Sequence, residues 1–354
     1  MIREYKSPNY NWRFDTVTGE FARWGKDLAD DPPMSPYGPE ILDLEISAGG
    51  DCLGNCAFCY KSNGGDKPTD NLGLSEFEVI LNKMPDTLTQ IAFGIMNLGT
   101  NPDFFNMMAV SRARGIIPNY TTHGLDLTEE YAKITADLCG AVAVSLVDAE
   151  KTFRAIELFT GAGMKQVNIH FMLSEQTWSR AAWLLEELRK RELNKKVNAV
   201  VFLHCKEKGR AKSTFSPLKD VAKYRTLINM AQSYEIGVGF DSCSAPMYLK
   251  TIEHSPQFKL LSMFAEPCES ALFSSYINHR GEFYPCSFME GEGDWKEGIN
   301  VLTAPDFLKD VWFNPRINDW RKILLGSSVN CNCEVKAFCR SCPQYNVTAC
   351  KSST

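Results

Sequence analysis

Apolar and polar positions alternate with two periods along residues 41–204. Short apolar, β-branched runs have the length of strands, and longer stretches between them repeat their apolar positions every three to four residues, as helices do. The strand-like runs are residues 41–47, 89–95, 115–122, 140–146, 165–173 and 196–204. The helical patterns are residues 74–84, 102–115, 127–139, 149–163 and 179–193. Gly115, Gly140 and Gly163 stand near helix ends, where left-handed caps are expected.

Strands that alternate with helices predict an α/β fold with a parallel sheet of βαβ units. Six strands are fewer than the eight of a closed barrel. The run "EIGVGF" (235–240) is predicted to be the last strand. Functional residues in such folds lie at the carboxyl ends of the strands.

The pattern changes after about residue 243. The stretch "SSYINHRGEFYPC" predicts a β-hairpin with Gly281 at its turn, and the chain beyond it is loop-rich. We therefore expect an extended N-terminal arm over residues 1–40 and the main α/β domain over 41–242. A bridge over 243–267 would lead to a small loop-rich domain over 268–354.

The composition is that of a globular protein, with 354 residues, 44% hydrophobic and 23% charged. A net charge of −5 without a basic tract argues against binding to long nucleic acids. The first twenty residues hold no apolar segment of a secretory signal, and every apolar run is too short to span a membrane. We expect a cytoplasmic protein that does not associate with membranes.

Thirteen cysteines are the unusual feature of the composition. An odd number in a long chain without a secretory signal argues against a disulfide framework. Ten of them fall into two groups, and such clustering in an intracellular protein indicates metal binding. The first group is Cys52, Cys56 and Cys59, and the second is Cys268, Cys286, Cys331, Cys333, Cys339, Cys342 and Cys350. Cys139, Cys205 and Cys243 stand alone.

The first group has the spacing C-x3-C-x2-C, directly after the first predicted strand. Cysteine thiolates are the usual ligands of iron–sulfur clusters. Three thiolates on a four-iron cluster leave one iron open, and an open position on a metal is where a substrate or cofactor binds. The alternative is a zinc knuckle whose fourth ligand lies elsewhere in the chain.

This loop, with Phe58 before its last cysteine, resembles the signature of the radical S-adenosylmethionine superfamily. The resemblance implies a partial (β/α)6 barrel and a [4Fe–4S] cluster at Cys52, Cys56 and Cys59. It also implies S-adenosylmethionine on the open iron, and a reducing partner such as flavodoxin or ferredoxin. One electron then cleaves the cofactor to methionine and a 5′-deoxyadenosyl radical, which abstracts a hydrogen from the substrate.

The resemblance also implies cofactor contacts near the ends of successive strands. The acid of the family's second-strand motif is absent here, and Asn97 stands in that region beside Ile95 and Met96. His170 has the alternative interpretation of a core histidine, and Leu203 that of a core leucine. The residues expected to bind the cofactor are Phe58, Asn97, Thr122, Ser145, Asn168, His170 and Leu203.

The second cysteine group resembles the SPASM extension, which carries auxiliary iron–sulfur clusters. By the family's interleaved pattern, Cys268, Cys286 and Cys342 would hold the first auxiliary cluster. Its fourth position could be open, or filled by Cys243 or by a group other than cysteine. The second cluster would be held by Cys331, Cys333, Cys339 and Cys350. A single auxiliary [4Fe–4S] cluster and a zinc-ribbon-like site are the alternatives.

The resemblance implies radical modification of a peptide or protein side chain, although the arm over residues 1–40 is too short for a separate peptide-recognition domain. The alternatives are a nucleotide, a nucleic-acid base or a small molecule as substrate, and a non-catalytic iron–sulfur electron carrier. Asp241 is a candidate proton acceptor. Cys243 could return a hydrogen atom to a product radical, bind a cluster or only pack. Some sulfatase-maturing members of the family have an acid directly after the cysteine that corresponds to Cys286. This chain has Ser287 there, so the resemblance argues against formylglycine formation.

Overall fold

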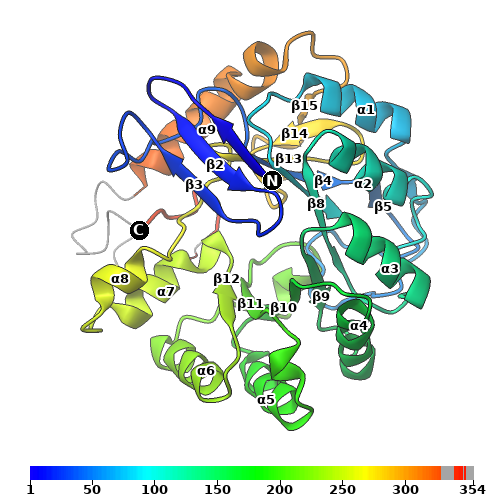
Figure 1. Cartoon of the computed structure of the whole chain (residues 1–354), viewed down its shortest axis with the longest axis vertical. Helices are drawn as coiled ribbons and strands as arrows, with labels where there is room; N and C mark the ends of the chain where they lie inside the picture. The colour runs from blue at the N-terminus through cyan, green and yellow to red at the C-terminus, as the bar shows by residue number, and fades with distance from the viewer. Residues whose placement is uncertain (328–338, 346, 348–354) are drawn as a thin grey trace.

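The computed structural model describes residues 1–327, 339–345 and 347, and its largest sheet has ten strands (Figure 1). In spatial order these strands are β12 (Val238–Phe240), β11 (Ala199–His204), β10 (Val167–Leu173), β9 (Val142–Ser145), β8 (Ile117–Thr122), β7 (Gln90–Gly94), β4 (Ile41–Glu45), β13 (Ser274–Ile277), β14 (Glu282–Tyr284) and β15 (Ile299–Asn300). The smaller sheets are β1 (Ile2–Tyr5), β2 (Asn11–Asp15) and β3 (Phe21–Trp24), and β5 (Ser47–Ala48) with β6 (Asp70–Asn71).

Helices connect the parallel strands. They are α1 (Leu74–Lys83), α2 (Phe104–Ala113), α3 (Glu129–Leu138), α4 (Ala149–Gly161), α5 (Trp178–Lys190) and α6 (Val221–Ser233). The later helices are α7 (Ala245–Ile252), α8 (Phe258–Ser262) and α9 (Pro315–Gly326). Short helical turns are η1 (Leu193–Lys195), η2 (Gly209–Ser213), η3 (Ser242–Ser244) and the π-helical η4 (Phe307–Trp312).

The seven strands from β4 to β12 are parallel, and α1 to α6 lie along the outside of their curved sheet (Figure 1). Alternate residues of each strand are buried under these helices, as Val167, Ile169 and Phe171 are on β10. The residues between them face the opposite side, which we call the lumen face. The sheet ends at β12 and β15 and does not close. The predicted partial α/β barrel is therefore confirmed.

The predicted hairpin forms as β13 and β14, and Gly281 has a φ of +74° at its turn. Strand β13 pairs in parallel with β4, so that Tyr276 lies opposite Asp43. The C-terminal region is thus joined to the barrel by backbone hydrogen bonds of one continuous sheet.

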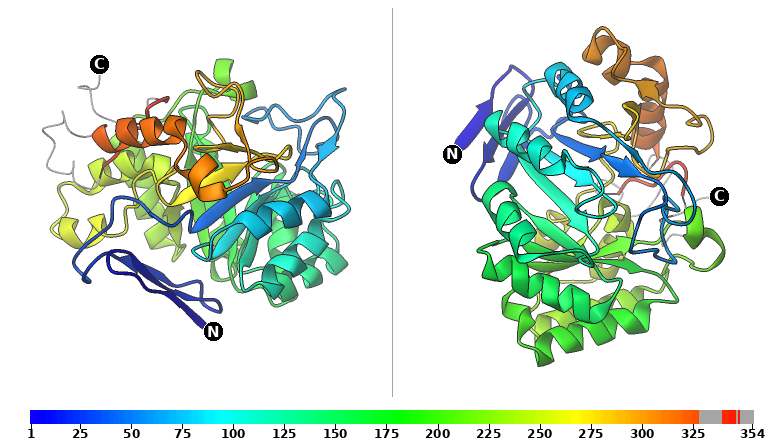
Figure 2. Two further views of the ribbon diagram at one scale, coloured as in Figure 1. Left: turned by 90° about the horizontal axis from the view of Figure 1, so that it is seen from above. Right: turned by 90° about the vertical axis from the view of Figure 1, so that its right-hand side faces the viewer.

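Residues 1–40 were expected to form an extended arm, but the structure folds residues 2–24 into the antiparallel sheet β1–β3. Trp12 and Phe14 are fully buried against Ile117, the first residue of β8. Arg3 Nη1 donates a hydrogen bond of 2.8 Å to the Gly115 carbonyl. This sheet therefore covers the amino ends of barrel strands, opposite the cysteine loop (Figure 2). The sheet forms because aromatic side chains at alternate positions are buried, and it does not require a long run of apolar residues.

The expected left-handed caps are confirmed at Gly115 and Gly163, which have φ of +71° and +98°. Gly140 does not have a positive φ. A Cβ at Gly140 would lie 2.5 Å from Ile117 Cγ2, so close packing explains the glycine there. Among the described residues, no helix has the length and apolar character needed to cross a membrane.

Candidate functional site

The loop with Cys52, Cys56 and Cys59 follows the carboxyl end of β4, as the sequence predicted. Arg210, on η2 after β11, holds this loop from the other side of the barrel. Its Nε donates to the Cys56 carbonyl at 2.8 Å, its backbone N–H donates to the Cys59 carbonyl at 3.0 Å, and its Nη1 donates to the Asn63 carbonyl at 2.7 Å. The cation also partly offsets negative charge on the Cys56 thiolate.

The three thiols lie near one another. Burial raises the pKa of the Cys56 thiol to about 11, and charges on Cys59 and Cys52 act in the same direction. Within the described part of the chain, no three Cys, His, Asp or Glu side chains are placed to hold a single metal ion. Three thiols from one short loop are the kind of donor that iron–sulfur clusters use.

Asn97 connects the end of β7 to the cysteine loop. Its Oδ1 accepts from the Leu53 N–H at 2.9 Å, and its Nδ2 donates to the Asp51 carbonyl at 2.5 Å. His123 Nε2 lies 2.9 Å from the same Oδ1, and His123 Nδ1 accepts from the Leu125 N–H at 3.0 Å. Both ring nitrogens are therefore engaged, which argues against His123 as the missing fourth ligand of a zinc knuckle.

Several predicted cofactor residues lie on the lumen face. Ser145 on β9 is in register with His170 on β10, and Leu203 is half-buried on β11. His170 Nδ1 lies 3.3 Å from Thr121 Oγ1. Burial lowers the pKa of His170 to about 4, so its ring is neutral near pH 7. These three residues share one wall of the lumen.

The other predicted cofactor residues are placed differently. Phe58 stands in the cysteine loop and contacts the Phe215 ring edge-on, at 6.3 Å between centroids. Thr122 is buried on the helix-covered face, where its Oγ1 accepts from the Gly124 N–H at 3.0 Å. Asn168 is near the amino end of β10, and its Oδ1 accepts from Asn198 Nδ2 at 3.0 Å. The lumen-facing threonine of this strand is Thr121, which the sequence analysis did not select.

The sequence analysis also missed two acids of the first strand. Asp43 and Glu45 alternate with the buried Leu42 and Leu44, so both face the lumen. The signal was present, because two acids at a spacing of two in an apolar strand share one face. Asp43 is accessible to solvent within the barrel, where Ala92 of β7 is its register neighbour. Although solvent reaches the side chain, enclosure by the barrel walls still desolvates the carboxylate and raises the pKa of Asp43 to about 6.

Replacing this acid should change stability in a pH-dependent way. A carboxyl group with a raised pKa in the folded state stabilises the fold when protonated, and this contribution is lost as pH rises through about 6. Asp43→Asn should therefore be more stable than the wild type at pH 8, by about 1 kcal/mol after allowance for solvent in the lumen. The difference should shrink at pH 5. Urea unfolding at both pH values measures it, with the exposed Asp137→Asn as control.

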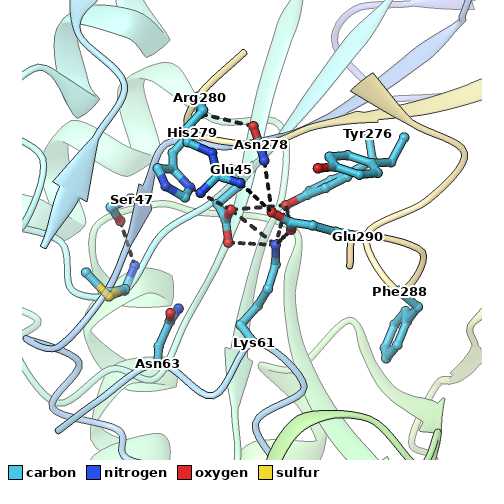
Figure 3. A network of polar contacts seen from close by, with 12 residues as sticks. Glu45, Ser47, Lys61, Asn63, Tyr276, Asn278, His279, Arg280, Phe288 and Glu290 are labelled. Atoms are coloured by element: carbon cyan, nitrogen blue, oxygen red, sulfur yellow. Dashed lines mark hydrogen bonds and ion pairs between the residues drawn. The ribbon is translucent and has the colours of Figure 1, made fainter. Parts of the chain in front are cut away.

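Glu45 belongs to a buried network that joins the cysteine loop to the hairpin (Figure 3). Lys61, two residues after Cys59, forms ion pairs with Glu290 and with Glu45 Oε1, the latter at 3.1 Å. The Tyr276 hydroxyl lies between the two acids, 3.1 Å from Glu45 Oε2 and 3.0 Å from Glu290 Oε2. Burial opposes the charge on Lys61, yet Glu45 and Glu290 raise the pKa of its ammonium group. Lys61 is therefore charged and paired.

Two further contacts complete this network. His279 Nδ1 lies 3.0 Å from Glu45 Oε2, and Asn278 Nδ2 donates to Glu290 Oε1 at 2.9 Å. Beside it, the Tyr60 ring stacks on Phe288 with 4.3 Å between centroids. Tyr60 follows Cys59, and Phe288 follows Cys286 by two residues. The two cysteine groups are thus linked by one layer of packed side chains.

The two candidate catalytic residues follow β12: Asp241 caps the amino end of η3, and Cys243 lies within it. Asp241 Oδ1 accepts from the Ser244 and His204 N–H groups at 3.0 and 3.1 Å, and Lys206 Nζ lies 3.1 Å from Oδ2. Although burial acts in the opposite direction, Lys206 holds the pKa of Asp241 below its ordinary value. Asp241 is therefore ionised and engaged on both oxygens. Burial raises the pKa of Cys243.

Four cysteines of the second group are described. Cys268, Cys286 and Cys342 lie within electrostatic reach of one another, because charges on Cys286 and Cys342 add to the effect of burial in raising the pKa of Cys268 to about 12. Cys339 packs against a small apolar cluster around Leu249. Cys331, Cys333 and Cys350 lie outside the described residues, so the predicted second auxiliary cluster stays a prediction.

Known protein structures resemble this fold, although no protein-family model and no curated protein sequence matches the chain. Streptococcus suis SuiB bound to the precursor peptide SuiA aligns with a TM-score of 0.74 at 14% identity, over 99% of this chain and 98% of that chain. SuiB bound to S-adenosylmethionine aligns with a TM-score of 0.60 at 15% identity, over 80% of this chain and 66% of that chain.

A second protein, anSMEcpe with bound S-adenosylmethionine and the Cp18Cys peptide, aligns with a TM-score of 0.59 at 16% identity. This alignment covers 79% of this chain and 82% of that chain. At these identities the likeness establishes the fold. The chain therefore shares its fold with SuiB and anSMEcpe, in agreement with the partial barrel that its sequence predicted.

Proposed function

We propose that the protein is a radical S-adenosylmethionine enzyme that abstracts a hydrogen atom from a peptide or protein side chain. The observation that carries the proposal is the three-cysteine loop at the carboxyl end of β4, above a lumen lined by polar side chains. Cys52, Cys56 and Cys59 would hold a [4Fe–4S] cluster. When bound, the cluster supplies the electron that cleaves S-adenosylmethionine to methionine and a 5′-deoxyadenosyl radical.

The residues of the loop fit this group. Three thiols come from one short segment, and Arg210 places a cation and three hydrogen bonds on the loop that carries them. His123, which lies beside the loop, is engaged through both ring nitrogens. Three thiolates would leave one iron of a four-iron cluster without a protein ligand. The amino and carboxylate groups of S-adenosylmethionine would bind at that open iron.

Ser145, His170 and Leu203 would line the cofactor site on the lumen wall, and Phe58 would border it from the loop. The neutral ring of His170 offers a hydrogen bond, not a charge. Asn97 would act mainly by positioning the loop, because its side-chain oxygen and nitrogen already bond within the protein. Thr122 and Asn168 would support the strands that carry the site.

The peptide substrate is supported by the likeness to SuiB in complex with its precursor peptide, which extends over almost the whole chain. The second cysteine group would hold one or two auxiliary [4Fe–4S] clusters. A small electron-transfer protein such as flavodoxin or ferredoxin would reduce the enzyme in the cell.

The test is to incubate dithionite-reduced, cluster-loaded protein with S-adenosylmethionine and to measure 5′-deoxyadenosine. Slow cleavage is expected even without substrate. Candidate peptides, nucleosides and small metabolites, each deuterated at candidate carbons, should then be added. We expect deuterium to be transferred from a labelled peptide to 5′-deoxyadenosine. Transfer from a nucleoside or a metabolite instead would contradict the peptide assignment, and no cleavage with an intact cluster would indicate an electron carrier.

A further inference from the structure

Cys243 lies beside the cysteines of the C-terminal region although it follows the last barrel strand. Lys206, at the end of β11, joins the two regions. Its ammonium group lies 3.1 Å from Asp241 Oδ2 and 4.1 Å from the centroid of the Phe288 ring, and its charge acts on the nearby Cys243 thiol. Phe288 follows Cys286 by two residues. The buried Lys206 therefore contacts both segments.

Further hydrogen bonds hold the segments that carry Cys268, Cys286 and Cys342 near Phe288. The Tyr345 N–H donates to Cys342 Sγ at 3.3 Å, and the Tyr345 hydroxyl donates to the Phe288 carbonyl at 3.2 Å. Ser270 Oγ donates to the Pro285 carbonyl at 2.8 Å, which ties the segment after Cys268 to the segment before Cys286. Three separate stretches of chain thus hold their cysteines around Phe288 and Lys206.

The four thiols also lie within electrostatic reach. After burial, charges on Asp241, Cys268 and Cys286 raise the pKa of Cys243, whereas Lys206 acts in the opposite direction. A metal centre would supply the positive charge that thiolates gathered at this buried place require.

We propose that Cys243 is the fourth protein ligand of the auxiliary cluster that Cys268, Cys286 and Cys342 would hold. The cluster is then closed and has no iron open to substrate, and Lys206 offsets part of its negative charge. This inference rests on the proposed function, because it takes the cysteines to bind iron–sulfur clusters. It deepens that proposal by choosing between an open and a closed auxiliary site.

The test uses the full chain with Cys52, Cys56 and Cys59 replaced by alanine, which removes the first-loop cluster. This background is compared with the same chain carrying Cys243→Ala in addition. Iron content and electron paramagnetic resonance spectra are recorded before and after cyanide, a probe for open irons, and after mild oxidation. Cys139→Ala in the same background is the matched control, because Cys139 is buried between α3 and β9.

The background and the control should not respond to cyanide. Cys243→Ala should respond, and on oxidation it should lose about one iron per chain and show a three-iron signal. A response of the background itself would show an open site and overturn the proposal, as would identical behaviour of Cys243→Ala and Cys139→Ala. If Cys243→Ala and the smaller change Cys243→Ser both fail to fold, the cyanide response of the triple-alanine background alone tests whether the auxiliary cluster is closed. These measurements involve no S-adenosylmethionine. A failure of this inference can therefore be distinguished from a failure of the proposed cleavage reaction.

Discussion

Replacing Cys52, Cys56 and Cys59 together by alanine should remove about four iron atoms per chain and abolish 5′-deoxyadenosine formation. The reason is that all three thiols of the proposed first cluster come from one loop, and His123 beside it is already engaged within the protein. The single change Cys56→Ala should also abolish cleavage, because two thiolates do not retain a four-iron cluster. Anaerobic iron analysis and chromatography of the nucleoside product measure the two effects.

The control for this loss is Cys205→Ala, which removes a buried cysteine that belongs to neither group. It should keep its iron and its cleavage activity. Iron content that stays unchanged in the triple variant would show that the first loop binds no cluster. Loss of iron with cleavage intact would instead place the reaction at another cluster.

Lys61→Met should destabilise the protein by about 3–5 kcal/mol, the usual cost of leaving a buried charge without its partner. Lys61 is the ammonium group between Glu45 and Glu290, and the side chains of both acids are less than one-fifth exposed. Without Lys61, two carboxylates would face each other across the Tyr276 hydroxyl. Anaerobic urea unfolding of the cluster-loaded protein measures the change.

Two comparison variants make this prediction specific. Lys61→Met combined with Glu290→Gln should recover part of the stability, because one of the unpaired charges is removed. Lys322→Met breaks an exposed pair with Asp319 and should cost less than about 1 kcal/mol. Equal effects of Lys61→Met and Lys322→Met would mean that the network does not hold the loop to the hairpin.

The local pattern of the sequence was sufficient for the barrel. Each expected strand and helix between residues 41 and 204 is present with nearly the expected bounds, because helix-covered parallel strands bury one face in a regular period. The cysteine loop was also evident, since ligands from one loop depend only on short-range spacing. The hairpin around Gly281 was predictable for the same reason, because a turn needs only its own residues.

Contacts between distant segments were not predictable in this way. The sheet β1–β3 forms because Trp12 and Phe14 find a buried surface at Ile117 and Phe273. The pairing of β13 with β4 brings Tyr276 beside Glu45, and no pattern within either segment specifies that partner. The same is true of Lys206, which looks like an ordinary surface lysine in the sequence and is buried between Asp241 and Phe288 in the fold.

The sequence by itself thus determined the parallel α/β architecture and the first cysteine loop, and its pattern also placed Asp43 and Glu45 on one face of β4, although the sequence analysis did not select them. The tertiary structure alone decided that Lys61 pairs with Glu45 and Glu290, and that Cys243 lies near Cys268 and Cys286. The physical reason is the range of the interactions. Strand and helix periods and loop spacing act over a few residues, whereas buried charges and thiols find their partners only when the sheet has brought separate segments together.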